Sequence, residues 1–192
     1  MGMTGLQTVL DNIRPSFEYN VLFVERFLTG EGLDMGCGNC PLLKDDCIHI
    51  DQAPQPIAAE QVGQDAVIHA DAVAFNPGYK VDYVFSSHMV EDLPSKQAII
   101  ACLNGWTKLL KPNGYIVLLL PDMQLERYPT VESGGNPSHR VNVGVKFINE
   151  IIPELNDLAI VQMDTIPHGK SCTLDVVFKK SSNSEGNGKE EA

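Results

Sequence analysis

The chain has few basic residues for its length. Its 192 residues include 14 Lys and Arg against 25 Asp and Glu, and the formal net charge is −11. Nucleic acids are held mainly by Lys and Arg side chains on their phosphates. The charge balance therefore makes a nucleic-acid partner unlikely and leaves a nucleoside or another small-molecule substrate open.

The sequence also lacks a long hydrophobic run. The longest, Tyr115–Pro121, is far shorter than the roughly 20 residues that a membrane-spanning helix needs. The first residues show neither the basic-then-apolar layout of a secretory signal nor the Arg-rich character of a transit peptide. The five cysteines are odd in number and irregularly spaced, which favours reduced thiols. We therefore expect a cytoplasmic protein that makes no contact with a membrane.

Internal repeats are absent as well. Hydrophobic residues make up 43% of the chain and charged residues 20%, a composition typical of globular domains. The last stretch, SSNSEGNGKEEA, is almost wholly polar. We expect one domain over residues 1–180 and a disordered tail over residues 181–192. The oligomeric state is left open.

Short apolar segments alternate with segments of helical periodicity. The expected strands are Glu31–Met35, Cys47–Ile50, Ala66–His69, Val81–Ser86, Tyr115–Leu120, Leu158–Thr165 and Thr173–Phe178. The expected helices lie within Leu6–Leu28 (broken near Pro15), Pro56–Val62, from the capping Ser95 to Leu110, and Val145–Ile152. This alternation within one domain predicts a doubly wound α/β sheet.

Three connections in this pattern are unusual. Few residues separate Gly38 from Ile48, so a crossover helix barely fits there. Lys111–Gly114 (KPNG) predicts a stop and a turn before the strand that follows. Met123–Arg140 predicts a long polar loop, a kind of connection that is often functional in compact domains.

The stretch GLDMGCGNC over Gly32–Cys40 carries the clearest functional signal. A buried strand end is followed by a turn with two glycines, which lets the backbone approach a ligand closely. Asp51 ends the next strand. A strand, a glycine turn and a carboxylate that can accept both ribose hydroxyls favour binding of an adenosine-type cofactor.

Five segments, in order, resemble a known family. They are GLDMGCGN at 32–39, IHIDQ at 48–52, HADA at 69–72, VDYVFSSHMVEDL at 81–93 and LKPNGYIVLLLPD at 110–122. Together they resemble the class I S-adenosylmethionine-dependent methyltransferases, in particular the small type 11-like branch. The resemblance implies S-adenosyl-L-methionine as cofactor. It also implies a seven-stranded, Rossmann-like sheet of order 3-2-1-4-5-7-6 with an antiparallel strand seven.

The resemblance also implies a set of cofactor-binding residues. Those that match the family's positions are Asp34, Gly36, Cys37, Gly38, Asp51, Gln52, Asp71, Ala72, Ser86 and Ser87. The glycine turn would lie along the amino-acid part of the cofactor, Asp51 would hold the ribose, and Asp71 would lie beside the adenine. Two features depart from the pattern: the helix after the first strand is almost missing, and Asp92 replaces a commonly seen histidine.

Two histidines are candidate proton acceptors for catalysis. His88 follows the fourth strand, where the resemblance places the transferable methyl group, although it could equally make a local contact at a helix start. His139 lies in the long loop that should reach over the carboxyl edge of the sheet. Arg140, next to it, and Asp122, at the end of the fifth strand, are candidate substrate contacts, although polar loop residues are often only solvated. His49, His69 and His168 are interpreted as structural.

The CxxC at Cys37–Cys40 could suggest a zinc or redox site. No second ligand pair follows at suitable spacing, so we expect no metal and interpret Cys37 as the small residue of the glycine turn.

Methyl transfer to an oxygen or nitrogen of a small-molecule or sugar-type acceptor is the function we expect. A nicotinamide-dependent oxidoreductase is an alternative, but GxGxxG would need glycine where Pro41 stands, and the connection is too short for the helix that binds pyrophosphate. A scaffold that binds the cofactor without turnover is a third possibility, because no obvious catalytic set is present.

Overall fold

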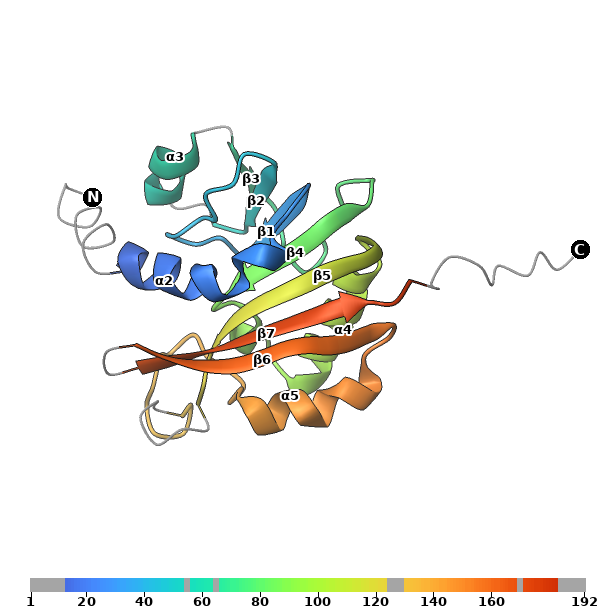
Figure 1. The fold of residues 1–192 in the computed structure, drawn as a ribbon. Helices are drawn as coiled ribbons and strands as arrows, with labels where there is room; N and C mark the ends of the chain where they lie inside the picture. The colour runs from blue at the N-terminus through green and yellow to red at the C-terminus, as the bar shows by residue number, and fades with distance from the viewer. Residues whose placement is uncertain (1–12, 54–55, 64–65, 124–129, 169–170, 183–192) are drawn as a thin grey trace, which may run out of the picture.

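The structure is a computed structural model that describes residues 13–53, 56–63, 66–123, 130–168 and 171–182. Most of the predicted tail over 181–192, and the start of the helix expected within Leu6–Leu28, lie outside these ranges. Seven strands form one sheet (Figure 1). They are β1 (Gly32–Met35), β2 (Cys47–Asp51), β3 (Val67–His69), β4 (Val81–Ser87), β5 (Leu110–Pro121), β6 (Leu158–His168) and β7 (Ser171–Lys180).

The strand order confirms the predicted fold. It runs β3-β2-β1-β4-β5-β7-β6, and β7 is antiparallel to both of its neighbours. The other pairs, from β3 to β5, are parallel. The carboxyl ends of five strands therefore meet at one edge of the sheet, which is where ligands bind in open α/β sheets.

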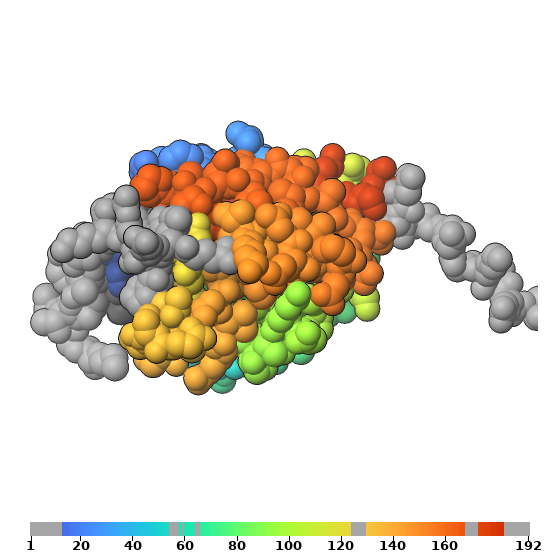
Figure 2. Space-filling view, turned by 90° about the horizontal axis from the view of Figure 1, so that it is seen from below, coloured from blue at the N-terminus to red at the C-terminus, as the bar shows by residue number. Residues whose placement is uncertain are grey.

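Helices cover both faces of the sheet. Helix α2 (Arg14–Val24) lies across one face, while α4 (Lys96–Thr107) and α5 (Val145–Ile151) lie on the other (Figure 1). The view in Figure 2 shows α4 and α5 side by side on that second face. A shorter helix, α3 (Pro56–Val62), precedes β3. None of the described helices has the length and apolar character to cross a bilayer.

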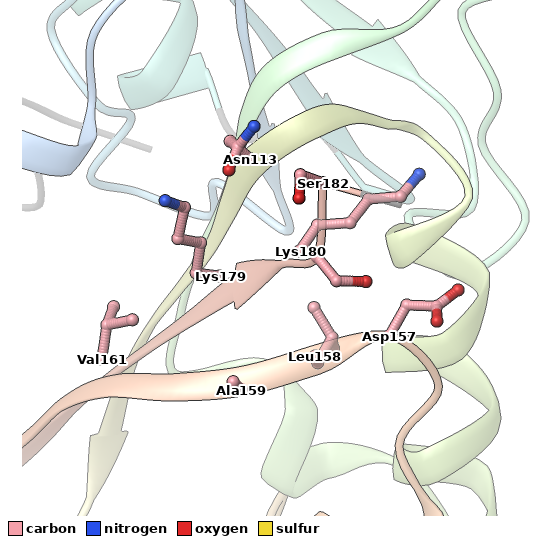
Figure 3. Close-up of a pocket in the computed structure, with 9 residues that line it drawn as sticks. Asn113, Asp157, Leu158, Ala159, Val161, Lys179, Lys180 and Ser182 are labelled. Atoms are coloured by element: carbon pink, nitrogen blue, oxygen red, sulfur yellow. The ribbon is translucent and has the colours of Figure 1, made fainter. Parts of the chain in front are cut away.

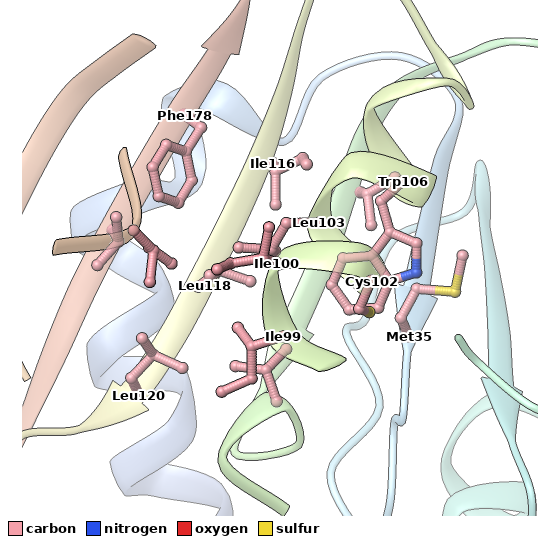
Figure 4. Close-up of a cluster of buried hydrophobic side chains, with 14 of the residues drawn as sticks. Met35, Ile99, Ile100, Cys102, Leu103, Trp106, Ile116, Leu118, Leu120 and Phe178 are labelled. Carbon is pink, nitrogen blue, oxygen red and sulfur yellow. The ribbon is translucent and has the colours of Figure 1, made fainter. Parts of the chain in front are cut away.

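Strand β5 is apolar on both faces because both are covered. Ile116, Leu118 and Leu120 pack toward α4, whereas Val117 and Leu119 belong to the cluster beneath α2. Figure 4 shows the first cluster, in which side chains of α4 lie against β5. Its largest member, Trp106, is fully buried, and its indole N–H donates to the Ala72 carbonyl at 3.0 Å. The helical spacing seen in the sequence thus identified a core face.

Two local predictions were wrong in detail. Helix α4 begins after Ser95, whose hydroxyl accepts from the Ala98 amide as expected, but it ends at Thr107 rather than Leu110. The turn residues KPNG lie within β5, where the register with β4 shifts between Val81 and Tyr83. A β-bulge accommodates extra residues of this kind without ending the strand.

Pro15 lies at the break that the sequence predicted. It occupies the first turn of α2, which begins at Arg14. Proline is tolerated in that position because the N–H groups of the first turn have no partner within the helix.

A carboxyl group is buried beneath α2. Asp175 of β7 is fully buried, and neither of its oxygens has a hydrogen-bond partner among the described residues. It shares a face with Thr173, whose hydroxyl accepts from Asn20 of α2 at 2.8 Å. Burial, with a smaller contribution from Asp164 on the paired strand, raises the pKa of Asp175 to about 8.

Stability should therefore fall as pH rises from about 4 to 8. Between these pH values Asp175 keeps its proton in the folded chain and loses it in the unfolded chain. Unfolding therefore releases a proton and becomes more favourable as the pH rises. We expect the free energy of unfolding to drop by about 2 to 4 kcal/mol between pH 5 and pH 8 from this group alone. Denaturant titrations of the wild type and Asp175→Asn at both pH values measure it. The variant should lose most of the slope, whereas Asp45→Asn, an exposed control, should keep it; equal slopes in all three would contradict the assignment.

Candidate functional site

The glycine turn after β1 is held by the end of β2. The amides of Gly36 and Cys37 donate to the Ile50 carbonyl at 2.8 and 3.2 Å, and the Gly38 amide donates to Asp51 Oδ2 at 2.9 Å. Gly36 and Gly38 have φ of 75° and 53°, in the left-handed region that favours glycine. Residues 36–46 contain no helix, as the sequence indicated. Contacts to β2 therefore fix the turn in place of a following helix.

Asp51 is oriented by two backbone amides. Besides the Gly38 amide on Oδ2, the Ala53 amide donates to Oδ1 at 2.8 Å. A carboxylate offers about four acceptor positions, so two remain for further donors. A ribose diol presents two hydroxyl donors, and the half-buried Asp51 is therefore suited to hold one.

Gly38, in the turn beside Asp51, faces open space. A Cβ added to Gly38 would meet no atom closer than the Gly36 carbonyl oxygen at 4.0 Å. The three amides of the turn already donate to Ile50 and Asp51, so they are not free to bind an anionic group.

Asp34 lies beneath this turn and is almost fully buried. Its Oδ2 accepts from the Leu42 amide at 2.8 Å and lies 3.1 Å from His49 Nδ1. These contacts hold the segment that follows the turn, and they give His49 the structural role that the sequence suggested. Among the predicted cofactor-binding residues, Asp34 is therefore the one whose contacts most clearly stabilise the local structure.

The residues expected near the adenine follow β2 and β3. Gln52 and Asp71 are exposed, and Asp71 Oδ1 accepts from the Val73 amide at 2.9 Å. Ala72 is buried, with its carbonyl bonded to Trp106. They lie at the same carboxyl edge of the sheet as Asp51.

Strand β4 ends beside the glycine turn. Ser86 is buried, and its hydroxyl donates to the Met35 carbonyl at 2.8 Å, which ties β4 to β1. Ser87 is half-buried. Met89 packs on the turn so closely that a Cβ on Gly36 would lie 2.5 Å from its Cγ. The segment that carries His88 is therefore a direct neighbour of the proposed cofactor site.

His88 and His139 meet at a residue that the sequence reasoning missed. Glu91 is fully buried, with its Oε1 3.3 Å from His88 Nδ1 and 3.6 Å from His139 Nε2. The side chain of His88 is 43% exposed, whereas that of His139 is only 3% exposed. The long loop thus places His139 in the interior. The spacing of His88 and Glu91, three residues apart, was the available signal.

The other two candidates on this side differ in exposure. Arg140 is exposed, and its backbone amide donates to the Glu91 carbonyl at 2.8 Å. Asp122 is buried, and its Oδ2 accepts from the Thr165 hydroxyl at 2.9 Å, which joins the ends of β5 and β6. Asp92 is half-buried; burial raises the pKa of its carboxyl group, with an added contribution from Glu91, while a hydrogen bond from Ser138 opposes the rise.

The cysteines of the turn are protonated thiols. Burial, reinforced by Asp34, raises the pKa of Cys47 to about 12, and burial likewise raises the pKa of Cys37 and of Cys40. Thiolates, not thiols, bind metals. In the described part of the chain, no group of three His, Cys, Asp or Glu side chains could hold a metal ion.

A separate hollow of about 420 Å³ lies at the opposite edge of the sheet (Figure 3). Asn113 of β5 and Lys179 and Lys180 of β7 line it. The Lys180 ammonium group donates to the Leu110 carbonyl at 2.9 Å. Since β5 carries its carboxyl end at Pro121, this hollow is a strand's length from Asp51 and His88.

A sheet of this order, with a glycine turn and an oriented acid on the second strand, has the class I methyltransferase fold. Residues 33–118 match the family model described as a methyltransferase domain. A search of curated proteins finds no match.

Solved structures agree on the fold. The N-methyltransferase NodS from Bradyrhizobium japonicum, in complex with S-adenosyl-L-homocysteine, has a TM-score of 0.66 at 18% identity over 89% of this chain and 90% of its own. Magnesium protoporphyrin IX methyltransferase from Synechocystis, with bound S-adenosylmethionine, scores 0.61 at 14% identity over 92% and 80%. The 1,6-didemethyltoxoflavin-N1-methyltransferase of Burkholderia thailandensis scores 0.63 at 15% identity over 93% and 83%.

These findings confirm the resemblance noted in the sequence. Residues 33–118 match the methyltransferase-domain model, and the sheet has the class I fold. The family match and the fold together support an S-adenosylmethionine-dependent methyltransferase, with S-adenosylmethionine as its cofactor.

Replacing Gly36 by alanine should damage the turn more than conformation alone predicts. Gly36 and Gly78 both have positive φ, 75° and 84°, but only Gly36 has a close neighbour, Met89. We expect Gly78→Ala to lower the free energy of unfolding by about 1 to 2 kcal/mol and Gly36→Ala by about 1 to 3 kcal/mol more, because of overpacking. Denaturant unfolding measures both. Adding Met89→Ala to Gly36→Ala should recover part of the difference; equal losses for the two glycines would refute the close packing.

Proposed function

We propose that the protein transfers a methyl group from S-adenosylmethionine to an oxygen or nitrogen of a small-molecule or sugar-type acceptor. The observation that carries the proposal is Asp51, which two amides orient beside a glycine turn whose Gly38 faces open space. When bound, the cofactor supplies a methyl group on a positively charged sulfur, which retains the electron pair of the broken bond.

The residues around the turn would contact different parts of the cofactor. Asp51 would accept from the ribose hydroxyls, and Gln52, Asp71 and Ala72 would lie along the adenine. Gly36, Cys37 and Gly38 would face the amino-acid part with Asp34 beneath them, and Ser86 and Ser87 would flank the methyl end. Carbonyl and carboxylate oxygens favour the cationic groups of this ligand over an anionic pyrophosphate.

A dinucleotide is a poorer fit to the same site. Pyrophosphate binds at a helix N-terminus, and residues 36–46 contain no helix. The three amides of the turn already donate to Ile50 and Asp51. The oxidoreductase alternative therefore lacks the donors that it needs.

His88 is the better of the two candidate proton acceptors, because its side chain is far more exposed than that of His139. A proton acceptor is needed if the acceptor molecule is a hydroxyl or a protonated amine. The exposed Arg140 could contact a substrate group of opposite charge. Asp122, which is buried against Thr165, would act by shaping the wall of the site.

A small acceptor molecule is consistent with the size of the described chain and with its charge. The described chain is occupied by the seven-stranded sheet and its helices, and the net charge of −11 disfavours polyanions. The similar structures include an enzyme named for methylating a nitrogen of 1,6-didemethyltoxoflavin, which supports this class of acceptor.

Asp51→Ala should weaken S-adenosylmethionine binding by about 10- to 100-fold. Loss of hydrogen bonds to a charged group costs about 1.5 to 3 kcal/mol, which sets this range. Isothermal titration calorimetry of the wild type and the variant measures it. Asp45→Ala, which removes the same charge from an exposed position, should bind like the wild type. A folded wild-type protein that binds no cofactor at millimolar concentration would overturn the proposal.

Turnover separates an enzyme from a silent scaffold. Methyl-labelled cofactor should transfer its label to at least one member of a panel of phenols, sugars and heterocyclic amines, and Asp51→Ala should strongly reduce the transfer when the cofactor is below saturation. Cofactor binding without any transfer across the panel would instead favour a scaffold.

A further inference from the structure

Glu91 is a fully buried acid that lies close to two histidines. Neither carboxyl oxygen has a hydrogen bond of good geometry within the described residues. The closest approach is to His88 Nδ1 at 3.3 Å, and His139 Nε2 follows at 3.6 Å, both from Oε1. A buried carboxyl group needs partners, since an unsatisfied one costs several kcal/mol. The imidazole N–H groups are the available donors.

The backbone fixes Glu91 in this place. It lies in the short 3-10 helix Val90–Asp92 that follows β4. Its carbonyl accepts from the amides of Arg140 and Val141 at 2.8 and 3.1 Å, which anchors the loop after β5. The carboxyl group is therefore held between two loops at the carboxyl edge of the sheet.

His88 is held at the same edge in a strained conformation. Its φ is 52°, which is unusual for a residue with a side chain, and its amide donates to the Leu119 carbonyl at 2.9 Å. Left-handed backbone at such a residue is strained and tends to occur at functional sites. The strain brings Nδ1 to Glu91, while the side chain remains 43% exposed.

We propose that Glu91 is the positioning residue that orients His88 as the proton acceptor for methyl transfer; this rests on the function proposed above. With Nδ1 of His88 lying 3.3 Å from Oε1 of Glu91, a proton on Nδ1 would be favoured, which leaves the lone pair of Nε2 for the proton of the acceptor. An acid that fixes the tautomer and direction of a histidine is a general arrangement for a catalytic base. His139 is too buried to reach an acceptor and serves as the second partner of Glu91.

The proton balance of the step is simple. The acceptor's O–H or N–H bond breaks, and its proton binds to Nε2 of His88. The electron pair left on the acceptor atom would form the new bond to the methyl carbon, while the bond from that carbon to sulfur would break with its electron pair kept by sulfur. His88 becomes an imidazolium beside Glu91 and releases the proton to water after the product leaves.

Histidine NMR tests the orientation without turnover. In ¹⁵N-histidine-labelled full-length protein, a two-bond ¹H–¹⁵N spectrum above neutral pH reports which ring nitrogen carries the proton, and His88→Gln identifies the His88 signals. We expect the Nδ1–H tautomer for His88 in the wild type and a shift to the Nε2–H tautomer in Glu91→Leu. An Nε2–H tautomer in the wild type, or one tautomer in both proteins, overturns the proposal.

Kinetics test the catalytic consequence. With a panel acceptor that the wild type methylates, Glu91→Gln should lower kcat about 10- to 100-fold, within the range of proton-transfer catalysis, and leave cofactor affinity within twofold. Glu150→Gln, an exposed control on α5, should change neither. An unchanged kcat in folded Glu91→Gln, with wild-type turnover intact, sinks the role of Glu91 alone. A wild type that binds no cofactor sinks the proposed function, and the NMR result still decides whether Glu91 orients His88.

Discussion

The parallel pairing of β1 with β2, without a helix between them, is the constraint on which the site depends. The turn after β1 would normally be fixed by the helix that follows it. Here the amides of Gly36 and Cys37 donate to Ile50 and that of Gly38 to Asp51. The same bonds that shape the turn therefore orient the acid, so the glycines and Asp51 form one structural unit. Positive φ at the two glycines follows from this geometry.

Asp175 and Glu91 are both fully buried, and their carboxyl groups have different surroundings. Asp175 lies beneath α2, where burial and Asp164 raise its pKa to about 8, so that it is mainly neutral at pH 7. Glu91 instead lies against two histidines at the carboxyl edge of the sheet. Only the second arrangement joins a buried group to an exposed one, His88. This connection is the basis of the role proposed for Glu91, whereas Asp175 is expected to act on stability.

The sequence predicted what depends on local pattern and motif order. The apolar YIVLLL segment became a strand covered on both faces, the spacing around Trp106 became the core face of α4, and motif order led to the sheet topology. The predictions from the sequence failed where contacts between distant segments determine the local structure. KPNG is a turn signal, but pairing with β4 absorbs it as a bulge. The importance of Glu91 depends on contacts with a loop almost 50 residues further on, which no local pattern reveals.

The burial of His139 leaves His88 as the exposed histidine of the two. A loop histidine would ordinarily be assigned to the substrate, since loops over this edge commonly carry function. Because Glu91 receives the amides of Arg140 and Val141, the loop is drawn inward and His139 is enclosed with it. The exposed imidazole is then His88, which β4 delivers beside the Met89–Gly36 contact. With the cofactor supplying the reactive methyl group, a site of this kind needs little beyond an oriented acid for the ribose and one oriented imidazole for the proton.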